Sequence, residues 1–199
     1  MNFLAHAWLA RGGSDGFLYG NLVADGVKGS DLSAWPDEVA SGIRHHRRVD
    51  AFVDGHTVIH SARSRAPQTL RRYTGIALDL MWDHFVARQL ELDVVDSRLV
   101  LRCYRLLEQR RPAPARLALM MPVLVEQDWL HRYADFDFTC RAVRGIGQRL
   151  SGPNRLAELV PWLQADYVAL ERDFQRLWPA VNEELEVPET GIGPSFNRP

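Results

Sequence analysis

Apolar residues recur at helical spacing through most of this 199-residue chain, and no segment alternates apolar and polar positions as a half-buried strand does. With Gly and Pro as stop signals, the spacing predicts helices at residues 1–10, 16–27, 36–54, 57–65, 69–91, 96–110, 115–131, 138–150, 154–163 and 165–185. Gly20, inside the second of these, should permit close approach of another backbone. We expect an all-α fold in a single domain over residues 1–185, followed by a flexible tail at 186–199 that is rich in Pro and Gly.

The segment 76–87, IALDLMWDHFVA, departs from a plain helical pattern. It is apolar nearly all round, as a buried helix is, yet it contains Asp79, Asp83 and His84. Asp79 and Asp83 are four residues apart and therefore share a face, which the period assigns to the core. An unpaired buried carboxylate costs several kcal/mol, so an arginine, a proton or a metal ion must compensate for each one. On this helix alone, Asp–Arg ion pairs and a metal site are equally good interpretations.

Three other predicted helices in the first half of the chain also place polar groups where apolar residues belong. These groups are His6 beside Asn2, Asn21 with Asp25, and His46 with Asp50. For any single residue an ion-paired role in the core explains the position equally well, but the whole set favours one shared metal or phosphate centre. Imidazole and carboxylate together suit Mn²⁺, Mg²⁺, Fe²⁺ or Zn²⁺ and leave positions for water and substrate.

The other histidines narrow the choice of ligands. His45 is adjacent to His46 and points about 100° away from it on a helix, so only one of the two is expected at the centre. His56 and His60 flank a Gly turn and are expected at the surface.

Basic residues are unevenly distributed, although the net charge is only −1. Between residues 40 and 75, the acidic residues are Asp50 and Asp54, and seven arginines give a local excess of five positive charges. These are Arg44, Arg47, Arg48, Arg63, Arg65, Arg71 and Arg72. Such a patch suits a phosphate group or an acidic protein partner. Because the aromatic residues lie at core spacing and form no exposed platform for bases, we expect no nucleic-acid partner.

The two cysteines and the apolar segments indicate a compartment. Cys103 and Cys140 are far apart and belong to no C-x-x-C motif, which is typical of a reduced, cytoplasmic protein and argues against structural zinc. No apolar run approaches the length of a membrane span, and the first residues lack the basic region of a signal peptide, so we expect no membrane partner.

The motifs G-x-S-x-G, H-E-x-x-H, G-x-x-x-x-G-K-[ST] and E-x-x-H are absent, which disfavours the enzyme classes that depend on them.

Six segments, rich in Trp, His and Asp, carry a resemblance to a known family. In order they are MNFLAHAWLA at 1–10, GNLVADGVKG at 20–29, GIRHHRRVD at 42–50, LDLMWDHFVAR at 78–88, DWLHRYADFDF at 128–138 and YVALERDFQRLWP at 167–179. From residue 1 to about residue 179 the chain resembles the acyl carrier protein phosphodiesterases, also called acyl carrier protein hydrolyases.

The resemblance implies a cytoplasmic, metal-dependent hydrolase assisted by Mn²⁺, with Mg²⁺ or Fe²⁺ as alternatives. Its substrate would be holo-acyl carrier protein. The reaction would cleave the phosphodiester between 4′-phosphopantetheine and a serine, giving apo-acyl carrier protein and free phosphopantetheine. The family is distantly related to the HD-type phosphohydrolases, which implies an all-α fold of that type. The His-Asp dipeptide of the HD group is absent, since Asp83-His84 has the reverse order.

The pattern and the resemblance together lead to a hypothesis for the site. The metal ligands would be His6, Asp25, His46, Asp50, Asp83 and His84. Asp79 would accept the proton of the attacking water, and Arg47 and Arg48 would stabilise the phosphate oxygens. The other arginines of segment 44–72 would steer the acidic carrier protein, with the oligomeric state left open.

Two other hypotheses stay open at this point. One is a metal-dependent phosphohydrolase that acts on a nucleotide or another small phosphodiester, and that is active without any carrier protein. The other is a non-catalytic helical module that binds an acidic partner without need of a divalent metal. The buried carboxylates argue against the second, because a binding surface does not require them.

Overall fold

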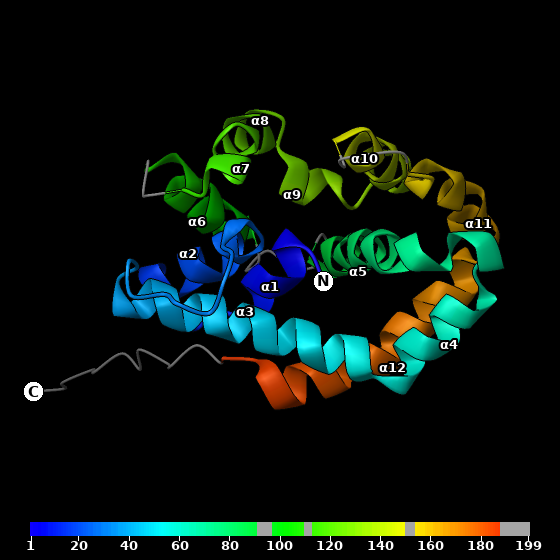
Figure 1. Cartoon of the computed structure of the whole chain (residues 1–199), viewed down its shortest axis with the longest axis horizontal. Coiled ribbons are helices and arrows are strands. Elements are labelled where there is room, and N and C mark those ends of the chain that lie inside the picture. Colours follow the sequence, from blue (N-terminus) through cyan, green and yellow to red (C-terminus); the bar gives the residue numbers. More distant parts are fainter. Residues whose placement is uncertain (91–96, 110–112, 150–153, 188–199) are drawn as a thin grey trace, which may run out of the picture.

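The structure is a computed structural model that describes residues 1–90, 97–109, 113–149 and 154–187. Within these residues it contains helices and no strand, which confirms the all-α prediction (Figure 1). The α-helices are α1 (Phe3–Leu9), α2 (Asp15–Val23), α3 (Asp37–Gly55), α4 (Thr57–Arg65), α5 (Thr74–Leu90), α6 (Ser97–Glu108), α7 (Ala115–Ala118), α8 (Met120–Glu126), α9 (Trp129–Arg132), α10 (Phe136–Arg149), α11 (Val160–Ala165) and α12 (Tyr167–Leu185). The 3₁₀ helices are η1 (Ala24–Gly26), η2 (Gln68–Tyr73) and η3 (Leu156–Leu159).

The short helix α1 lies inside the fold and packs against α2, α5 and α6. Figure 1 shows α3 running below it and α6 to α9 above it. Leu4, Ala5, Ala7 and Leu9 are fully buried. A helix of this length is not stable alone in water, so the surrounding helices hold it in place.

Helices α2 and α3 meet backbone to backbone at Gly20 and Gly42. A Cβ atom added at Gly20 would lie 2.2 Å from the carbonyl oxygen of Val39, and one added at Gly42 would lie 2.1 Å from the carbonyl oxygen of Phe17. No side chain fits at either position, which confirms that Gly20 permits a close approach. The contact holds the end of α2, with η1 behind it, against the first half of α3.

Four of the predicted helices are divided. The predicted helix 16–27 ends as the 3₁₀ helix η1, and the predicted helix 154–163 consists of η3 followed by α11. The predicted helix 115–131 is broken into α7, α8 and α9, because Pro122 cannot donate to the carbonyl of Ala118, where α7 ends. Asp128, with φ of 52°, then separates α8 from α9. The predicted helix 69–91 begins as the 3₁₀ helix η2 and becomes α-helical at Thr74.

The start of the predicted tail belongs to the folded part. The amide of Val187 donates to the carbonyl of Leu9 over 2.8 Å, and the amide of Gly12 donates to the carbonyl of Val187 over 3.0 Å. The prediction of a flexible tail at residues 188–199 lies outside the described residues. No helix in the described part of the chain combines the length and the apolar character that crossing a bilayer requires.

Candidate metal centre

Four elements bring imidazole and carboxylate groups together near the first residue of the chain. Figure 1 shows that residue between α3 and α5. His6 comes from α1, Asp25 from η1, His46 and Asp50 from α3, and Asp79 from α5. All five were predicted for this site, and we call them the polar centre.

His6, His46 and Asp50 form the inner part of the polar centre. One potential ligand atom from each residue lies within 4.8 Å of the other two. The Nε2 atom of His6 is 3.1 Å from Oδ1 of Asp50, and Nε2 of His46 is 3.1 Å from Oδ2 of the same carboxylate. The Nε2 atom of His46 also lies 3.3 Å from Oδ1 of Asp25. The carboxylate of Asp50 therefore bridges the Nε2 atoms of the two imidazoles.

The orientation of His46 is that of a metal ligand. Its Nδ1 lies 2.9 Å from the backbone carbonyl of Asn21, and because a carbonyl can only accept, Nδ1 carries the hydrogen. In the neutral ring Nε2 then presents its lone pair to the carboxylates, and a carbonyl behind the ring is the usual partner of a metal-bound histidine. Among the described residues, Nε2 of His46 and Nδ1 of His6 are buried nitrogens without a hydrogen bond of acceptable geometry. The imidazole nitrogens and carboxylate oxygens of the polar centre fit a divalent cation such as Mn²⁺, Mg²⁺ or Fe²⁺.

The α-ammonium group of Met1 also lies in the polar centre. Its nitrogen is 2.9 Å from Oδ1 of Asp79 and 3.2 Å from Oδ1 of Asp50. Although burial opposes the charge, these two carboxylates raise the pKa of the ammonium group to about 11. One positive charge is therefore held between α3 and α5.

The histidines differ in charge. Burial and the neighbouring His46 lower the pKa of His6 to about 3. Burial also opposes the charge of His46, but Asp25 and Asp50 raise its pKa to about 9. At neutral pH, one ammonium and one imidazolium thus face the carboxylates of Asp25, Asp50 and Asp79. Since negative charge is in excess, a bound divalent cation would be stabilised.

Asp83 lies behind the polar centre. Its side chain is fully buried, and its two oxygens accept the amide hydrogens of Leu4 and Ala5 over 2.9 and 3.0 Å. Burial raises the pKa of Asp83 to about 7, against the effect of these two hydrogen bonds. A carboxylate at this end of α1 also meets the positive end of the helix dipole. Asp83 therefore anchors the helix that carries His6, and we leave it out of the ligand set proposed below.

His84, also predicted as a ligand, belongs to a different network. Its Nδ1 donates to the carbonyl of Tyr133 over 2.8 Å, and its Nε2 accepts from the hydroxyl of Tyr167 over 2.7 Å. That hydroxyl in turn accepts a hydrogen bond from Arg88. Both ring nitrogens are thus engaged away from the polar centre.

Arg47 and Arg48 do not point at the polar centre either. Arg47 donates to the carbonyl of Val27 over 3.0 Å and so holds the segment that follows Asp25. Arg48 is exposed and lies about 200° around α3 from His46.

Sequence patterns missed two members of the site, the amino group of Met1 and the carbonyl of Asn21. One is the amino group of the first residue and the other a backbone carbonyl, so no pattern of side chains could reveal them.

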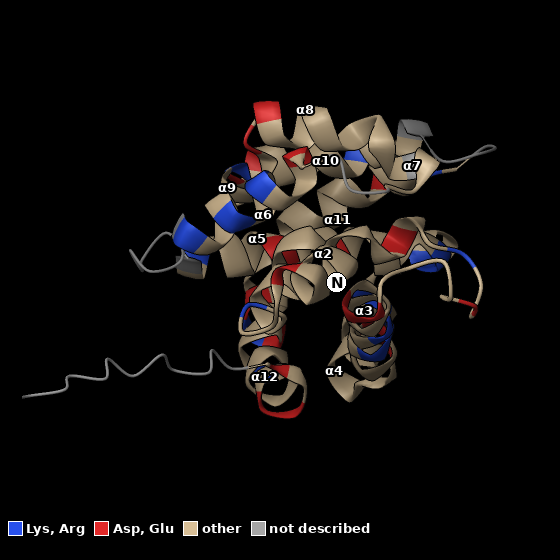
Figure 2. Cartoon of the chain, turned by 90° about the vertical axis from the view of Figure 1, so that its left-hand side faces the viewer, with Lys and Arg blue, Asp and Glu red and all other residues tan. Residues whose placement is uncertain are grey.

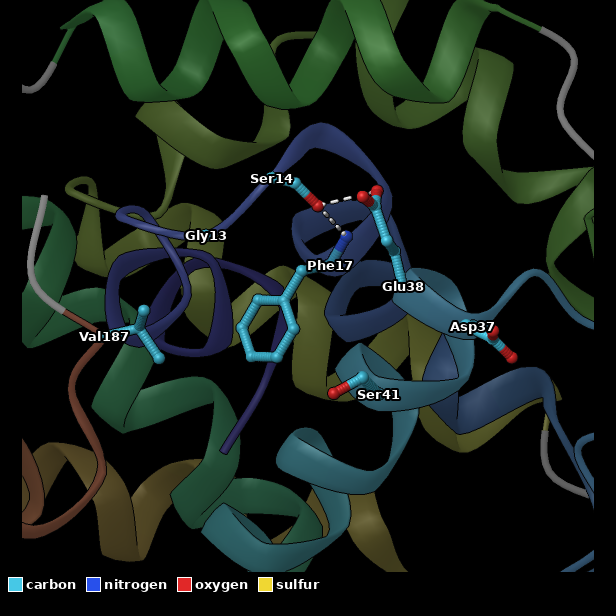
Figure 3. A pocket seen from close by; sticks show the side chains of 7 residues that line it. All are labelled: Gly13, Ser14, Phe17, Asp37, Glu38, Ser41 and Val187. Carbon is cyan, nitrogen blue, oxygen red and sulfur yellow. Dashed lines mark hydrogen bonds between the residues drawn. The ribbon is translucent and has the colours of Figure 1, made fainter. Parts of the chain in front are cut away.

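A separate hollow shares no residue with the polar centre. Its lining consists of Gly13, Ser14, Phe17, Asp37, Glu38, Ser41 and Val187 (Figure 3). The hydroxyl of Ser14 donates to Glu38 over 2.8 Å and accepts from the amide of Phe17, which caps α2. The two acidic side chains at this hollow would repel a phosphate group, so it does not compete with the polar centre as a phosphate site.

Comparison with known proteins gives a consistent result. Residues 1–181 match the family model described as acyl carrier protein phosphodiesterase. A protein of that name from Shigella boydii serotype 18 is 35% identical over 185 residues, which cover 90% of this chain and 94% of the relative. Relatives of the same name from Salmonella dublin and Enterobacter sp. (strain 638) are 35% and 34% identical over 183 residues, with the same coverage.

No solved structure matches the chain significantly, so the distant likeness to HD-type phosphohydrolases stays a prediction. The family match spans the four elements of the polar centre, and the relatives agree with it over nearly their whole length. On these grounds the chain belongs to the acyl carrier protein phosphodiesterase family.

Proposed function

We propose that this protein hydrolyses the phosphodiester between 4′-phosphopantetheine and a serine of acyl carrier protein, giving apo-acyl carrier protein and free phosphopantetheine. The names of its relatives support the substrate and the bond. The convergence of His6, His46 and Asp50, with ligand atoms within 4.8 Å of one another, supports a metal-dependent reaction.

We further propose His6, Asp25, His46 and Asp50 as the residues that hold a divalent cation, with Mn²⁺ favoured over Mg²⁺ or Fe²⁺. Such a cation would polarise the phosphodiester and make a water molecule more acidic. Asn21 would keep His46 in the correct tautomer through its carbonyl. Asp83 would keep His6 in position through α1.

Asp79 is the proposed proton acceptor. Its carboxylate faces the same ammonium group as Asp50, and its side chain is 40% exposed, so water can reach it. Partial burial raises the pKa of Asp79, while the ammonium group of Met1 opposes the shift, and a carboxylate with a raised pKa is a stronger base.

The arginines on the surface offer a docking area for an acidic carrier protein, and Figure 2 shows basic residues along α3. Arg65 is bound to Asp166 and Asp173, and Arg63 to Asp54, so both form ion pairs within the fold. Within the basic segment 40–75, four exposed arginines form no ion pair with a described residue, and we propose them as the docking residues: Arg44, Arg48, Arg71 and Arg72.

A reducing compartment such as the cytoplasm suits the two cysteines. Cys103 and Cys140 are both buried and unpaired. Burial raises the pKa of the Cys103 thiol to about 12, which makes it unreactive.

Intact-protein mass spectrometry of holo-acyl carrier protein, incubated with this protein and either Mn²⁺ or EDTA, tests the proposal directly. We expect loss of the phosphopantetheine mass with Mn²⁺ and none with EDTA. Asp50→Asn is the matched inactive variant.

Other outcomes would replace the proposal. Turnover of small phosphodiesters with no change in the carrier would indicate a small-molecule phosphohydrolase. Tight binding of the carrier without turnover under either condition would indicate a non-catalytic binding module.

A further inference from the structure

Arg63, on α4, joins the two helices that carry carboxylates of the polar centre. Its Nη2 atom donates to Oδ1 of Asp54 on α3 over 2.8 Å. The same atom would lie only 2.9 Å from a Cβ atom added at Gly75 on α5. The guanidinium group therefore sits where the end of α3, α4 and the start of α5 meet (Figure 1).

Both contact points of Arg63 are one helical turn from the polar centre. Asp54 follows Asp50 by four residues on α3, and Gly75 precedes Asp79 by four residues on α5. Residues with this spacing share a face, and one turn is about 5.4 Å long. The guanidinium group thus lies about one turn from two of the carboxylates, on the helix faces that line the centre.

Gly75 makes this position available. A side chain there would displace the Nη2 atom, since a contact of 2.9 Å is shorter than real Cβ atoms make. Only glycine lets the guanidinium group lie against the backbone at the start of α5.

The ion pair with Asp54 can be exchanged at low cost. The side chains of Arg63 and Asp54 are 33% and 64% exposed. Exposed pairs of this kind contribute little to stability, because water screens them. Arg47, by contrast, is held at the carbonyl of Val27, and Arg48 points away from the centre.

We propose that Arg63 binds the non-bridging oxygens of the scissile phosphodiester, and that Asp54 holds its guanidinium group when no substrate is bound. A planar guanidinium donates two parallel hydrogen bonds to a phosphate, which a lysine cannot do. This role rests on the proposed function for the substrate, but the phosphate-binding chemistry is independent of the carrier protein.

The test measures binding of inorganic phosphate to the Mg²⁺-loaded protein by isothermal titration calorimetry. Arg63→Ala removes the guanidinium group, Arg63→Lys keeps the charge and loses the planar fork, and Gly75→Ala displaces the group without any change of charge. Arg105→Ala is the matched control, because Arg105 forms an exposed ion pair with Asp15 on α2. Circular dichroism and the Mg²⁺ affinity of each variant show that fold and metal binding persist.

We expect Arg63→Ala to weaken phosphate binding roughly tenfold to a hundredfold, the range for a charge-assisted hydrogen bond. Arg63→Lys should fall between Arg63→Ala and the wild type, and Gly75→Ala should weaken binding although the net charge is unchanged. Asp54→Asn should tighten binding, and by more in the wild type than in the Arg63→Ala background, because it frees the guanidinium group.

Wild-type phosphate affinity in both Arg63→Ala and Gly75→Ala would overturn the proposal. So would equal effects of Asp54→Asn in the two backgrounds. Turnover of holo-acyl carrier protein is measured in parallel. If the wild type fails to act on the carrier but binds phosphate through Arg63, the role of Arg63 stands and the proposed substrate falls.

Discussion

The imidazole rings of His6 and His46 lie face to face, with their centroids 3.6 Å apart and 13° between their planes. Two imidazolium ions at this distance would repel each other, so only one of the two rings carries a positive charge. Burial and the charge of His46 lower the pKa of His6 to about 3, whereas the adjacent aspartates, against burial, raise that of His46 to about 9. The metal-free pair therefore consists of one neutral and one charged ring, while metal ligation requires two neutral rings.

Metal binding near neutral pH should release about one proton, mainly from His46. Because its folded-state pKa is raised above 6.5, the stability that its charge contributes is complete below pH 6.5 and is lost as pH rises through about 9. The metal competes with this proton, so metal affinity should increase with pH up to about 9. Calorimetric titration with Mn²⁺ in buffers of different ionisation enthalpy measures the release. A binding enthalpy independent of the buffer would contradict this picture.

Addition of Mn²⁺ should raise the melting temperature. At a hundred times the dissociation constant the gain is about 2.7 kcal/mol, or about 5–10 °C for a domain of this size. Asp50→Asn should lose the shift, because it removes the carboxylate that contacts the Nε2 atoms of both histidines. Asp54→Asn, one turn further along α3, is the control that should keep it. Differential scanning fluorimetry is sufficient, and an equal shift in both variants would exclude Asp50 as a ligand.

Asp79→Asn should separate metal binding from catalysis. The amide cannot accept the proton of water, so turnover should fall by about 10²- to 10⁴-fold, the usual contribution of a general base. The proposed ligands are untouched, so the Mn²⁺-induced rise in melting temperature should persist. Steady-state rates with holo-acyl carrier protein provide the measurement. An Asp79→Asn variant with the wild-type rate would mean that another group accepts the proton.

Asp83→Asn should lower the stability of the protein without removing a proposed metal ligand. Each oxygen of Asp83 accepts one hydrogen bond, from Leu4 or from Ala5, and in asparagine one of these oxygens becomes an NH₂ group that faces a backbone donor. We expect a loss of about 1–3 kcal/mol in the free energy of unfolding, measured by urea denaturation. Metal affinity should decrease as well, because α1 carries His6. Full stability with complete loss of metal binding would instead identify Asp83 as a ligand.

Gly20→Ala tests the contact between α2 and α3. A methyl group 2.2 Å from the carbonyl oxygen of Val39 forces the helices apart, which should cost about 1–3 kcal/mol or more. Gly145→Ala is the matched control in α10, where an added Cβ meets nothing within 4 Å. That variant should be stabilised by up to about 1 kcal/mol, because alanine is the better helix former. Equal melting temperatures for the two variants would contradict the close packing.

Much of the polar centre could be predicted from spacing alone. His46 and Asp50, and likewise Asp79 and Asp83, stand four residues apart on faces that the apolar period assigns to the core. In the structure His46 and Asp83 are buried, whereas the side chains of Asp50 and Asp79 are 37% and 40% exposed. What the pattern could not supply is the partner of each charge. Asp83 meets the amides of Leu4 and Ala5, and His84 meets Tyr133 and Tyr167, all far away in the chain.

By itself the sequence determined the helical class, most helix positions and the set of polar residues that had to be compensated, because period and burial depend on neighbours a few residues apart. Only the tertiary structure decided which of them face one another. It placed His6, Asp25, His46, Asp50 and Asp79 together and set Asp83 and His84 apart. The physical reason is that a metal ion, a backbone amide or another side chain can each compensate for a buried polar side chain. The packing of distant helices selects which of these partners is present.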